Sequence, residues 1–296
     1  MQACSSVTLR GLVIYVLAFG STHAAADAPT AAEVIARIQR ATGGAGAWHD
    51  DTVDTFKAGD PQTPVTGIAT TFSATMDVLE RAVAHHRNLI ISHEPVFYNH
   101  FDETAWLAND PVYQHKRDFI AQHHLVLWRF HDHIHQSPAM PDMIQQAMVA
   151  ALHWQALQDK SNPARFHTPP ITLAALAAQI RERLHIRMLR VIGDPSFKVT
   201  SFAFIPGAAP RATQIGALRD EGVQVLVAGE SAEWETVLYV QDSVAPQRKS
   251  LILLGHEPSE ELGMQACAQW LKPLVPEAQV EFIPVGEPFW SPQSPH

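Results

Sequence analysis

Apolar residues along the chain alternate between short continuous runs and spacings of three and four. The short runs predict buried strands, and the wider spacings predict amphipathic helices. In the first half we expect strands at residues 65–72, 88–92 and 125–130 and helices at residues 30–40, 76–86, 110–124 and 141–152. In the second half we expect strands at residues 186–192, 201–205, 223–228 and 250–254 and helices at residues 172–184, 211–221 and 259–271. This alternation predicts an α/β fold.

A polar segment with three prolines, residues 158–170, interrupts the alternation and predicts a connection between two lobes. We therefore expect an N-terminal lobe at residues 27–157 and a C-terminal lobe at residues 171–296. A chain of 296 residues is long enough to bury a core in each lobe.

The first 26 residues follow a different pattern. Residues 1–10 contain one basic side chain, residues 11–20 are apolar, and residues 21–26 end in small side chains. This order is typical of a secretory signal peptide, and its apolar run is too short to cross a bilayer. We expect residues 1–26 to be removed on export, which leaves a periplasmic or secreted protein with no stable membrane insertion. Loss of Cys4 leaves Cys267 alone, which excludes an internal disulfide.

Composition narrows the function classes. A formal net charge of -9 and a hydrophobic content of 46% exclude a disordered tail and argue against a nucleic-acid partner. The unusual number is 17 His, against 21 Lys and Arg together. Because imidazole is the commonest metal ligand and a frequent proton carrier, the positions of the histidines are the main functional signal.

Histidines follow three of the expected strands at their carboxyl ends, where open α/β sheets build their sites. They and their acidic neighbours are His93 and Glu94 after residues 88–92, His131, His133 and His135 after residues 125–130, and His256 and Glu260 after residues 250–254. The four-residue spacing of His256 and Glu260 places both on one helical face if a helix begins at His256. Nitrogen and oxygen donors without a thiolate predict a divalent transition metal, Zn, Mn, Fe, Co or Ni, as one or two ions.

These motifs resemble the NIF3-like dinuclear metal proteins, also called the GTP cyclohydrolase I type 2 or DUF34 family. The segments that carry the resemblance are NLIISHEPVFYNH, RFHDHIH, VLVAGE and LILLGHEPSEELGM, which occur in the family's order over about residues 65–289. The resemblance implies two similar α/β lobes that face each other across a metal cleft. It also implies a homo-oligomer, commonly a toroidal hexamer.

The resemblance implies a set of metal ligands and two departures from it. The ligands that match in type are His93, His131, His256 and Glu260. Glu94 stands where the family has the second histidine of a pair, and His135 stands where it has the aspartate that usually bridges two metals. We keep His135 as an expected ligand. Glu94 either replaces a bridging or second-metal ligand or acts as a general base beside one metal.

For other residues near these motifs we expect simpler roles. We expect Glu230, Trp234 and Glu235 to line the cleft, with the alternative that Glu230 caps the next helix. The expectation for Tyr98, Asn99 and His100 is that they orient His93 or bind substrate, with a plain turn built on Asn99 as the alternative. His100 and His133 are also candidates to support the ligands. We expect His85, His86, His123 and His124 to end helices, and Trp106, Trp234, Trp270 and Trp290 to pack in the interior. Glu257 is expected to be a solvated charge, and Cys267 an inert core residue.

Two functions from different classes fit the pattern. The first is a metal-dependent hydrolase of the cell envelope or exterior that acts on an unknown small molecule, with Glu94 as its catalytic carboxylate. The second is a non-catalytic metal-binding or scaffolding oligomer in which the ion holds the lobes together. A metallo-β-lactamase-like enzyme is disfavoured, because the pair His131 and His133 is not followed by the Asp-His pair of that motif.

Overall fold

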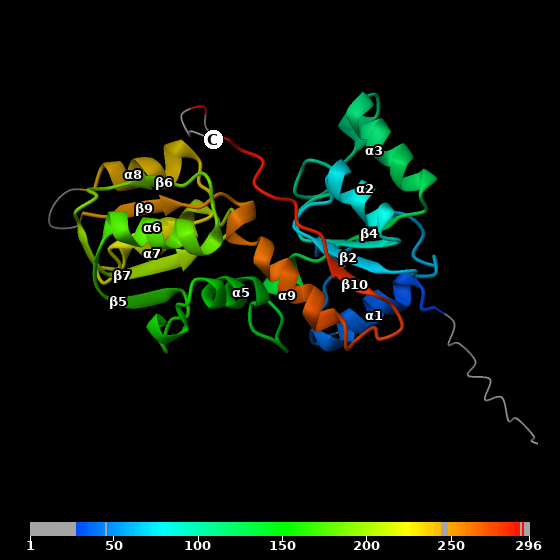
Figure 1. Cartoon of the computed structure of the whole chain (residues 1–296), viewed down its shortest axis with the longest axis horizontal. Coiled ribbons are helices and arrows are strands. Elements are labelled where there is room, and N and C mark those ends of the chain that lie inside the picture. Colours follow the sequence, from blue (N-terminus) through cyan, green and yellow to red (C-terminus); the bar gives the residue numbers. More distant parts are fainter. Residues whose placement is uncertain (1–27, 45, 244–247, 291, 293–296) are drawn as a thin grey trace, which may run out of the picture.

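The computed structural model describes residues 28–44, 46–243, 248–290 and 292, so the expected signal peptide lies outside the described part. Two five-stranded sheets form two α/β lobes side by side (Figure 1). The expected α/β fold of two lobes is therefore confirmed. Within the described residues, no helix is both long enough and apolar enough to span a membrane.

The first sheet has the strand order β1-β4-β3-β2-β10. Its strands are β1 (Phe56–Ala58), β2 (Ile68–Thr71), β3 (Leu89–Ser92), β4 (Val126–Arg129) and β10 (Val280–Phe282). The three central strands, β2, β3 and β4, are parallel and buried along their whole length. This is why they appear in the sequence as continuous apolar runs.

The helices of the first lobe begin where the sequence supplies a capping side chain. They are α1 (Ala31–Ala41), α2 (Met76–Ala84) and α3 (Pro111–Gln122). The side chains of Thr30, Thr75 and Asp110 each accept a hydrogen bond from a backbone N–H in the first helical turn. Capping of this kind satisfies donors that the helix itself leaves unpaired.

The second sheet has the strand order β5-β7-β8-β9-β6. Its strands are β5 (Arg165–Thr172), β6 (Arg190–Ile192), β7 (Lys198–Ile205), β8 (Val225–Ala228) and β9 (Ser250–Leu253). Its helices are α6 (Leu173–Leu184), α7 (Arg211–Arg219) and α8 (Leu238–Gln241). The three central strands are parallel, and the edge strands β5 and β6 are antiparallel to their neighbours.

Helices α5 (Met143–Ala151) and α9 (Glu261–Leu271) lie between the two sheets and contact each other (Figure 1). Gly263 makes the close approach of these helices possible. A Cβ atom at this position would lie 2.2 Å from Ile144 Cδ1 and 2.8 Å from Ile144 Cα. Any larger residue would push the helices apart.

The lobe boundaries differ from the expected ones at both ends of the second lobe. Strand β10 pairs with β2 of the first sheet, and Met264, Cys267 and Leu271 of α9 lie in the first lobe's core. The C-terminal lobe therefore does not include all of residues 171–296. The expected connection at residues 158–170 also contains the start of β5, which begins at Arg165. Apolar periodicity identifies a strand or helix without identifying the sheet that buries it.

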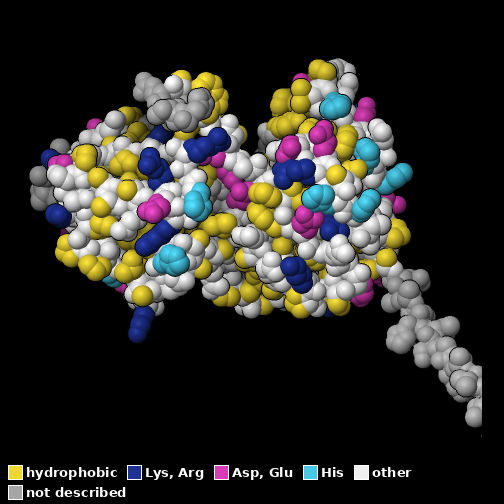
Figure 2. Space-filling view, viewed as in Figure 1, with side chains coloured by type: hydrophobic (Ala, Val, Ile, Leu, Met, Phe, Trp, Pro, Cys, Tyr) yellow, Lys and Arg dark blue, Asp and Glu magenta, His cyan; other side chains and the backbone are white. Residues whose placement is uncertain are grey.

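Several histidines end helices, as expected. His85 and His123 are the C-caps of α2 and α3, and the next residues, His86 and His124, have left-handed φ values of 59 and 50. Figure 2 shows histidine side chains gathered over the surface of the first lobe.

The tryptophans do not all follow the expectation. Trp270 packs against the first lobe's core, but Trp106, Trp234 and Trp290 are exposed by 67%, 77% and 70%. Their expected packing in the interior is therefore wrong, because residue type alone does not tell a buried ring from an exposed one. Cys267 is fully buried, and burial raises the pKa of its thiol, which is consistent with the expected inert role.

Candidate metal centre

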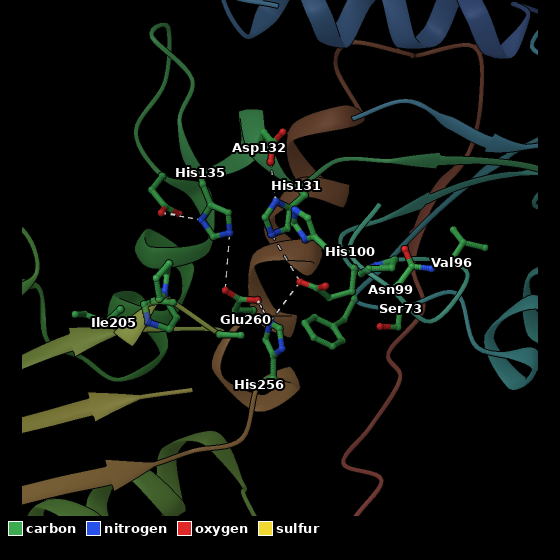
Figure 3. A pocket seen from close by; sticks show the side chains of 18 of the residues that line it. Ser73, Val96, Asn99, His100, His131, Asp132, His135, Ile205, His256 and Glu260 are labelled. Atoms are coloured by element: carbon green, nitrogen blue, oxygen red, sulfur yellow. Dashed lines mark hydrogen bonds and ion pairs between the residues drawn. The ribbon is translucent and has the colours of Figure 1, made fainter. Parts of the chain in front are cut away.

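The expected ligands come from strand ends in both lobes. His93 follows β3 and His131 follows β4, and because these strands are parallel neighbours both residues leave the same edge of the first sheet. His256 follows β9 of the second sheet, and Glu260 directly precedes α9. The four side chains meet at the junction of the lobes (Figure 3).

Glu260 lies at the centre of this cluster. Its Oε2 is 3.3 Å from His93 Nε2 and 3.1 Å from His256 Nε2. Its Oε1 is 3.8 Å from Nε2 of His135, which ends the short helix α4 (Asp132–His135). The four-residue spacing of His131 and His135 is therefore one helical turn, which aims both rings at the same point (Figure 3).

Glu94 faces the same point from the other side. Its Oε1 lies 3.3 Å from His256 Nε2 and 3.8 Å from Nε2 of both His93 and His131. Two overlapping sets of donor atoms lie within 4.8 Å of one another. They are His93, His131 and His135 in one set and His93, Glu94 and Glu260 in the other. All six residues singled out from the sequence are thus brought together.

Each of the four clustered histidines is held through the ring nitrogen that points away from the cluster. The Nδ1 partners are the Phe130 carbonyl oxygen for His93 at 3.1 Å, Asp132 for His131 at 2.9 Å, Asp142 for His135 at 3.0 Å and Glu230 for His256 at 3.5 Å. An Nδ1–H that donates to such an acceptor leaves the Nε2 lone pair free to bind a cation. Outer partners of this kind are typical of metal-binding histidines.

Two buried atoms test whether the cluster suits a metal. Among the described residues, His93 Nε2 and Glu260 Oε2 have no hydrogen-bond partner, although His93 is fully buried and Glu260 is 3% exposed. Leaving such groups unpaired away from water is unfavourable. A divalent cation would pair with both at once, and the nitrogen and oxygen donor set suits Zn, Mn, Fe, Co or Ni. The residues therefore fit the metal that the motifs imply.

The carboxylates and the histidines of the cluster stabilise each other's charged forms. Burial raises the pKa of Glu260, but the neighbouring His256 and His93 rings outweigh burial and hold that pKa well below its ordinary value. Burial also raises the pKa of Glu94, but the neighbouring histidine rings outweigh burial and leave that pKa at about 2. Burial lowers the pKa of His256, whereas Glu230, Glu260 and Glu94 raise it to about 12. A proton on His256 and a cation in the cluster therefore compete for the same carboxylates.

Arg129 is a member of the site that the sequence pattern did not reveal. It is fully buried, and it donates from Nε to the His93 carbonyl oxygen at 3.1 Å and from Nη1 to the His100 carbonyl oxygen. Its Nη2 lies 3.7 Å from Glu94 Oε2. The guanidinium thus places a buried positive charge beside the Glu94 carboxylate. The signal that was available is a charged residue inside the apolar strand run VLWRF.

Asp54 is a second member that sequence reasoning missed. Its buried carboxylate accepts from the backbone N–H groups of His131 at 2.6 Å, Asp132 at 2.9 Å and His133 at 2.9 Å. It also bonds Nδ1 of His133 at 2.8 Å. His133 therefore does not reach the cluster, and its ring instead stacks on Trp48 with the centroids 3.6 Å apart. Asp54 and His133 support the loop that carries two of the expected ligands.

The other residues singled out from the sequence lie around the cluster in different positions. Glu230 is the Nδ1 partner of His256, and His100 lies edge-on to His131 with ring centroids 5.7 Å apart. Glu235 pairs with Arg211 and lines a small neighbouring cavity. Glu257 is 8% exposed, so its expected role as a solvated charge is wrong. Burial and the adjacent Glu261 raise the pKa of Glu257 to about 9.

A cavity of about 1190 Å³ opens onto the cluster. The first lobe contributes Tyr98, Asn99 and His100 to its wall, and the second lobe contributes Ile205 and Pro206. Glu94 lines this space together with His131, His135, His256 and Glu260 of the cluster. The site is therefore large enough for a small molecule and is bounded by both lobes.

The fold and the site define a class of protein, a two-lobed α/β protein with a His/Glu cluster suited to a divalent metal between its lobes. The family model Duf34/NIF3 (NGG1p interacting factor 3) matches residues 53–287. The chain belongs to the Duf34/NIF3 family.

Two curated relatives and one solved structure are similar to this chain. A "GTP cyclohydrolase 1 type 2 homolog" of Chlamydia pneumoniae is 24% identical over 245 residues, which is 79% of this chain and 90% of that protein. A protein of the same name from Clostridium acetobutylicum is 25% identical over 185 residues, 59% of this chain and 66% of that protein. The Bacillus cereus protein related to NIF3 has a TM-score of 0.72 at 12% identity, over 90% of this chain and 100% of that one. At this identity the structural likeness shows the fold alone.

Proposed function

We propose that this protein is a divalent-metal-dependent hydrolase of small molecules. The observation that carries the proposal is the position of Glu94. Its carboxylate lies 3.3 Å from His256 Nε2 and 3.8 Å from His93 Nε2, and the residue also lines a cavity of about 1190 Å³, where water and a substrate can both reach it. A spare carboxylate at this position is what general-base hydrolysis requires.

The residues of the site have different roles in the proposed reaction. The residues that would hold the ion are His93, His131, His135, His256 and Glu260. When bound, the ion would supply Lewis-acid polarisation of the scissile group and make water more acidic. Glu94 would accept the proton from the attacking water and then deliver it to the leaving group. Arg129 would keep a positive charge beside the Glu94 carboxylate.

The test is turnover by the purified protein after loading with Zn, Mn, Fe(II), Co or Ni. Panels of amides, phosphoesters and cyclic amidines cover the main hydrolytic reactions. We expect turnover of one class that disappears in His93→Ala together with the bound metal. A metal-loaded protein that is inert on every panel would contradict the proposal.

A second candidate is a metal-binding scaffold without chemistry. The observation in its favour is that His93 and His256 follow strands of different sheets, so one ion would tie the two lobes together. Under this alternative the protein atoms would fill the coordination sphere. X-ray absorption spectra with and without an added chelating inhibitor separate the two, because a closed sphere would not change.

The cellular setting belongs to the proposal as well. The pattern of residues 1–26 supports export to the periplasm or the exterior, and membership of the family supports a homo-oligomer. Cell fractionation with N-terminal sequencing tests export, and sedimentation of the purified protein tests assembly. A cytoplasmic protein that retains Met1, or a monomer, would contradict the respective statement.

A further inference from the structure

The charges that line the large cavity are mostly negative. Its carboxylates are Glu94, Glu260, Asp132 and Asp142. One divalent ion would balance Glu94 and Glu260, and the other two would keep their charge. Lys116 is the single Lys or Arg among the described residues of this lining.

Lys116 is not available to an anion in the cavity. Its Nζ donates to the Val96 carbonyl oxygen at 2.6 Å, and the residue is 4% exposed. Arg129 is equally withdrawn, because it lies behind Glu94 and is fully buried. Neither cation can move into the cavity without losing its hydrogen bonds.

A smaller cavity that adjoins the large one repeats this arrangement. The N-terminus of α7 borders both the large cavity and a smaller one, through Ala209 and Pro210. Arg211 at this terminus pairs with Glu235 at 3.3 Å, and Glu230 lines the same small cavity. The positive end of the helix and the Arg211 side chain are thus already matched by the chain's own carboxylates.

The uncharged part of the wall is apolar and comes from both lobes. Phe72 and Val96 line it on one side, and Ile205 and Pro206 line it on the other. A substrate with an apolar portion would bury that portion here while its reacting group faces the metal ligands.

We propose that this cavity takes a small cationic or uncharged molecule with an apolar part, such as an amide or an amidine, and rejects polyphosphates. The inference rests on the proposed function, because it assumes that the metal is open to the cavity. A polyphosphate would meet only the metal as a cationic partner and would be repelled by the surrounding carboxylates. A substrate amine would be attracted by the same charges.

Metal-anchored probes test the charge preference directly. Zinc-loaded protein is titrated by calorimetry with benzohydroxamate, 4-(aminomethyl)benzohydroxamate and 4-carboxybenzohydroxamate. Because the three share one chelating group, their affinities differ only through the para substituent. We expect the aminomethyl probe to bind about ten-fold more tightly than the carboxy probe, with a difference that shrinks at high salt.

The possible results distinguish failure of the proposed function from failure of the charge preference alone. If benzohydroxamate itself does not bind, the metal is closed to the cavity, and the proposed function fails together with this inference. If it binds but the carboxy probe binds as tightly as the aminomethyl probe, the charge preference is overturned and the proposed hydrolase stands. GTP that binds the zinc-loaded protein more tightly than guanosine would overturn the rejection of polyphosphates.

A matched pair of variants tests the origin of the preference. Glu235→Gln removes one carboxylate from the adjoining small cavity, and we expect it to reduce the ratio of the two affinities by about two- to three-fold. Glu80→Gln removes an exposed carboxylate on α2 away from the cavity and should leave the ratio unchanged. Equal ratios in both variants would overturn the electrostatic origin.

Discussion

Asp54 bonds both the backbone N–H and the ring Nδ1 of His133, at 2.9 Å and 2.8 Å, from a loop 79 residues earlier in the chain. The same carboxylate accepts from the backbone of His131, a proposed metal ligand. It acts on the centre only by positioning the ligand loop.

Asp54→Asn should therefore weaken metal binding in a folded protein. The amide has one acceptor oxygen in place of two, so part of the support for the loop at His131 is lost. We expect metal affinity to fall by about 10–100-fold, as measured by competition with a chromophoric chelator. Asp102→Asn is the control, since Asp102 is similarly buried but pairs with Lys57. Equal losses of affinity in both variants would mean that Asp54 has only a general structural role.

Glu94→Gln separates the two roles of this side chain. If Glu94 is a general base, the variant keeps its metal content and loses about 10²–10⁴-fold in turnover. Metal analysis and kinetics on the same sample make the measurement. Loss of the metal along with turnover would identify Glu94 as a ligand and would remove the proposed base.

Lys116 makes the free energy of unfolding depend on pH in the alkaline range. Burial lowers the pKa of Lys116 to about 8, although Asp102 raises it, whereas the unfolded chain keeps a pKa of about 10.4. Between these values the unfolded state holds a proton that the folded state has lost, so stability rises with pH. The gain is at most about 3 kcal/mol by pH 10.5.

Urea unfolding from pH 7.5 to 10.5 measures this gain. We expect Lys116→Met to lack the part of the rise that the wild type shows above pH 8. Lys272→Met changes an exposed lysine and should retain it. An identical rise in Lys116→Met would refute the assignment.

Gly263 tests the contact between α5 and α9, and Gly216 provides the control. Gly263→Ala places a Cβ within 2.8 Å of the Ile144 backbone, so we expect a loss of about 1–3 kcal/mol in unfolding free energy. Gly216→Ala in α7 meets no heavy atom within 4 Å and should stabilise by about 0.5–1 kcal/mol. Chemical denaturation measures both. A neutral Gly263→Ala would show that the helices can separate without loss.

The sequence predicts the ligand-bearing strand ends well, because a buried parallel strand and the residue that follows it form one local pattern. His93, His131 and His256 are found in this way. Asp54 and Arg129 are not, because their importance depends on hydrogen bonds to backbone groups that are distant in sequence. No periodicity marks such contacts.

The same limit applies to the fold. The apolar face of residues 259–271 predicts helix α9 but not its place in the first lobe's core. A short strand such as Val280–Phe282 has too few residues for a clear alternation, so β10 was missed. Which sheet receives such a segment depends on the free edge of β2 and on the core around Ile68 and Leu89.

The return of the chain to its first sheet has a consequence for biosynthesis. The first lobe is synthesised earliest, yet β10 and the core residues Met264, Cys267 and Leu271 emerge from the ribosome only at the end. Folding of domains generally follows the order of synthesis. Here the order is reversed, and the second lobe can be completed while the first still lacks an edge strand and part of its interior. The proposed metal ligands from the two lobes can come together only after both lobes have been synthesised.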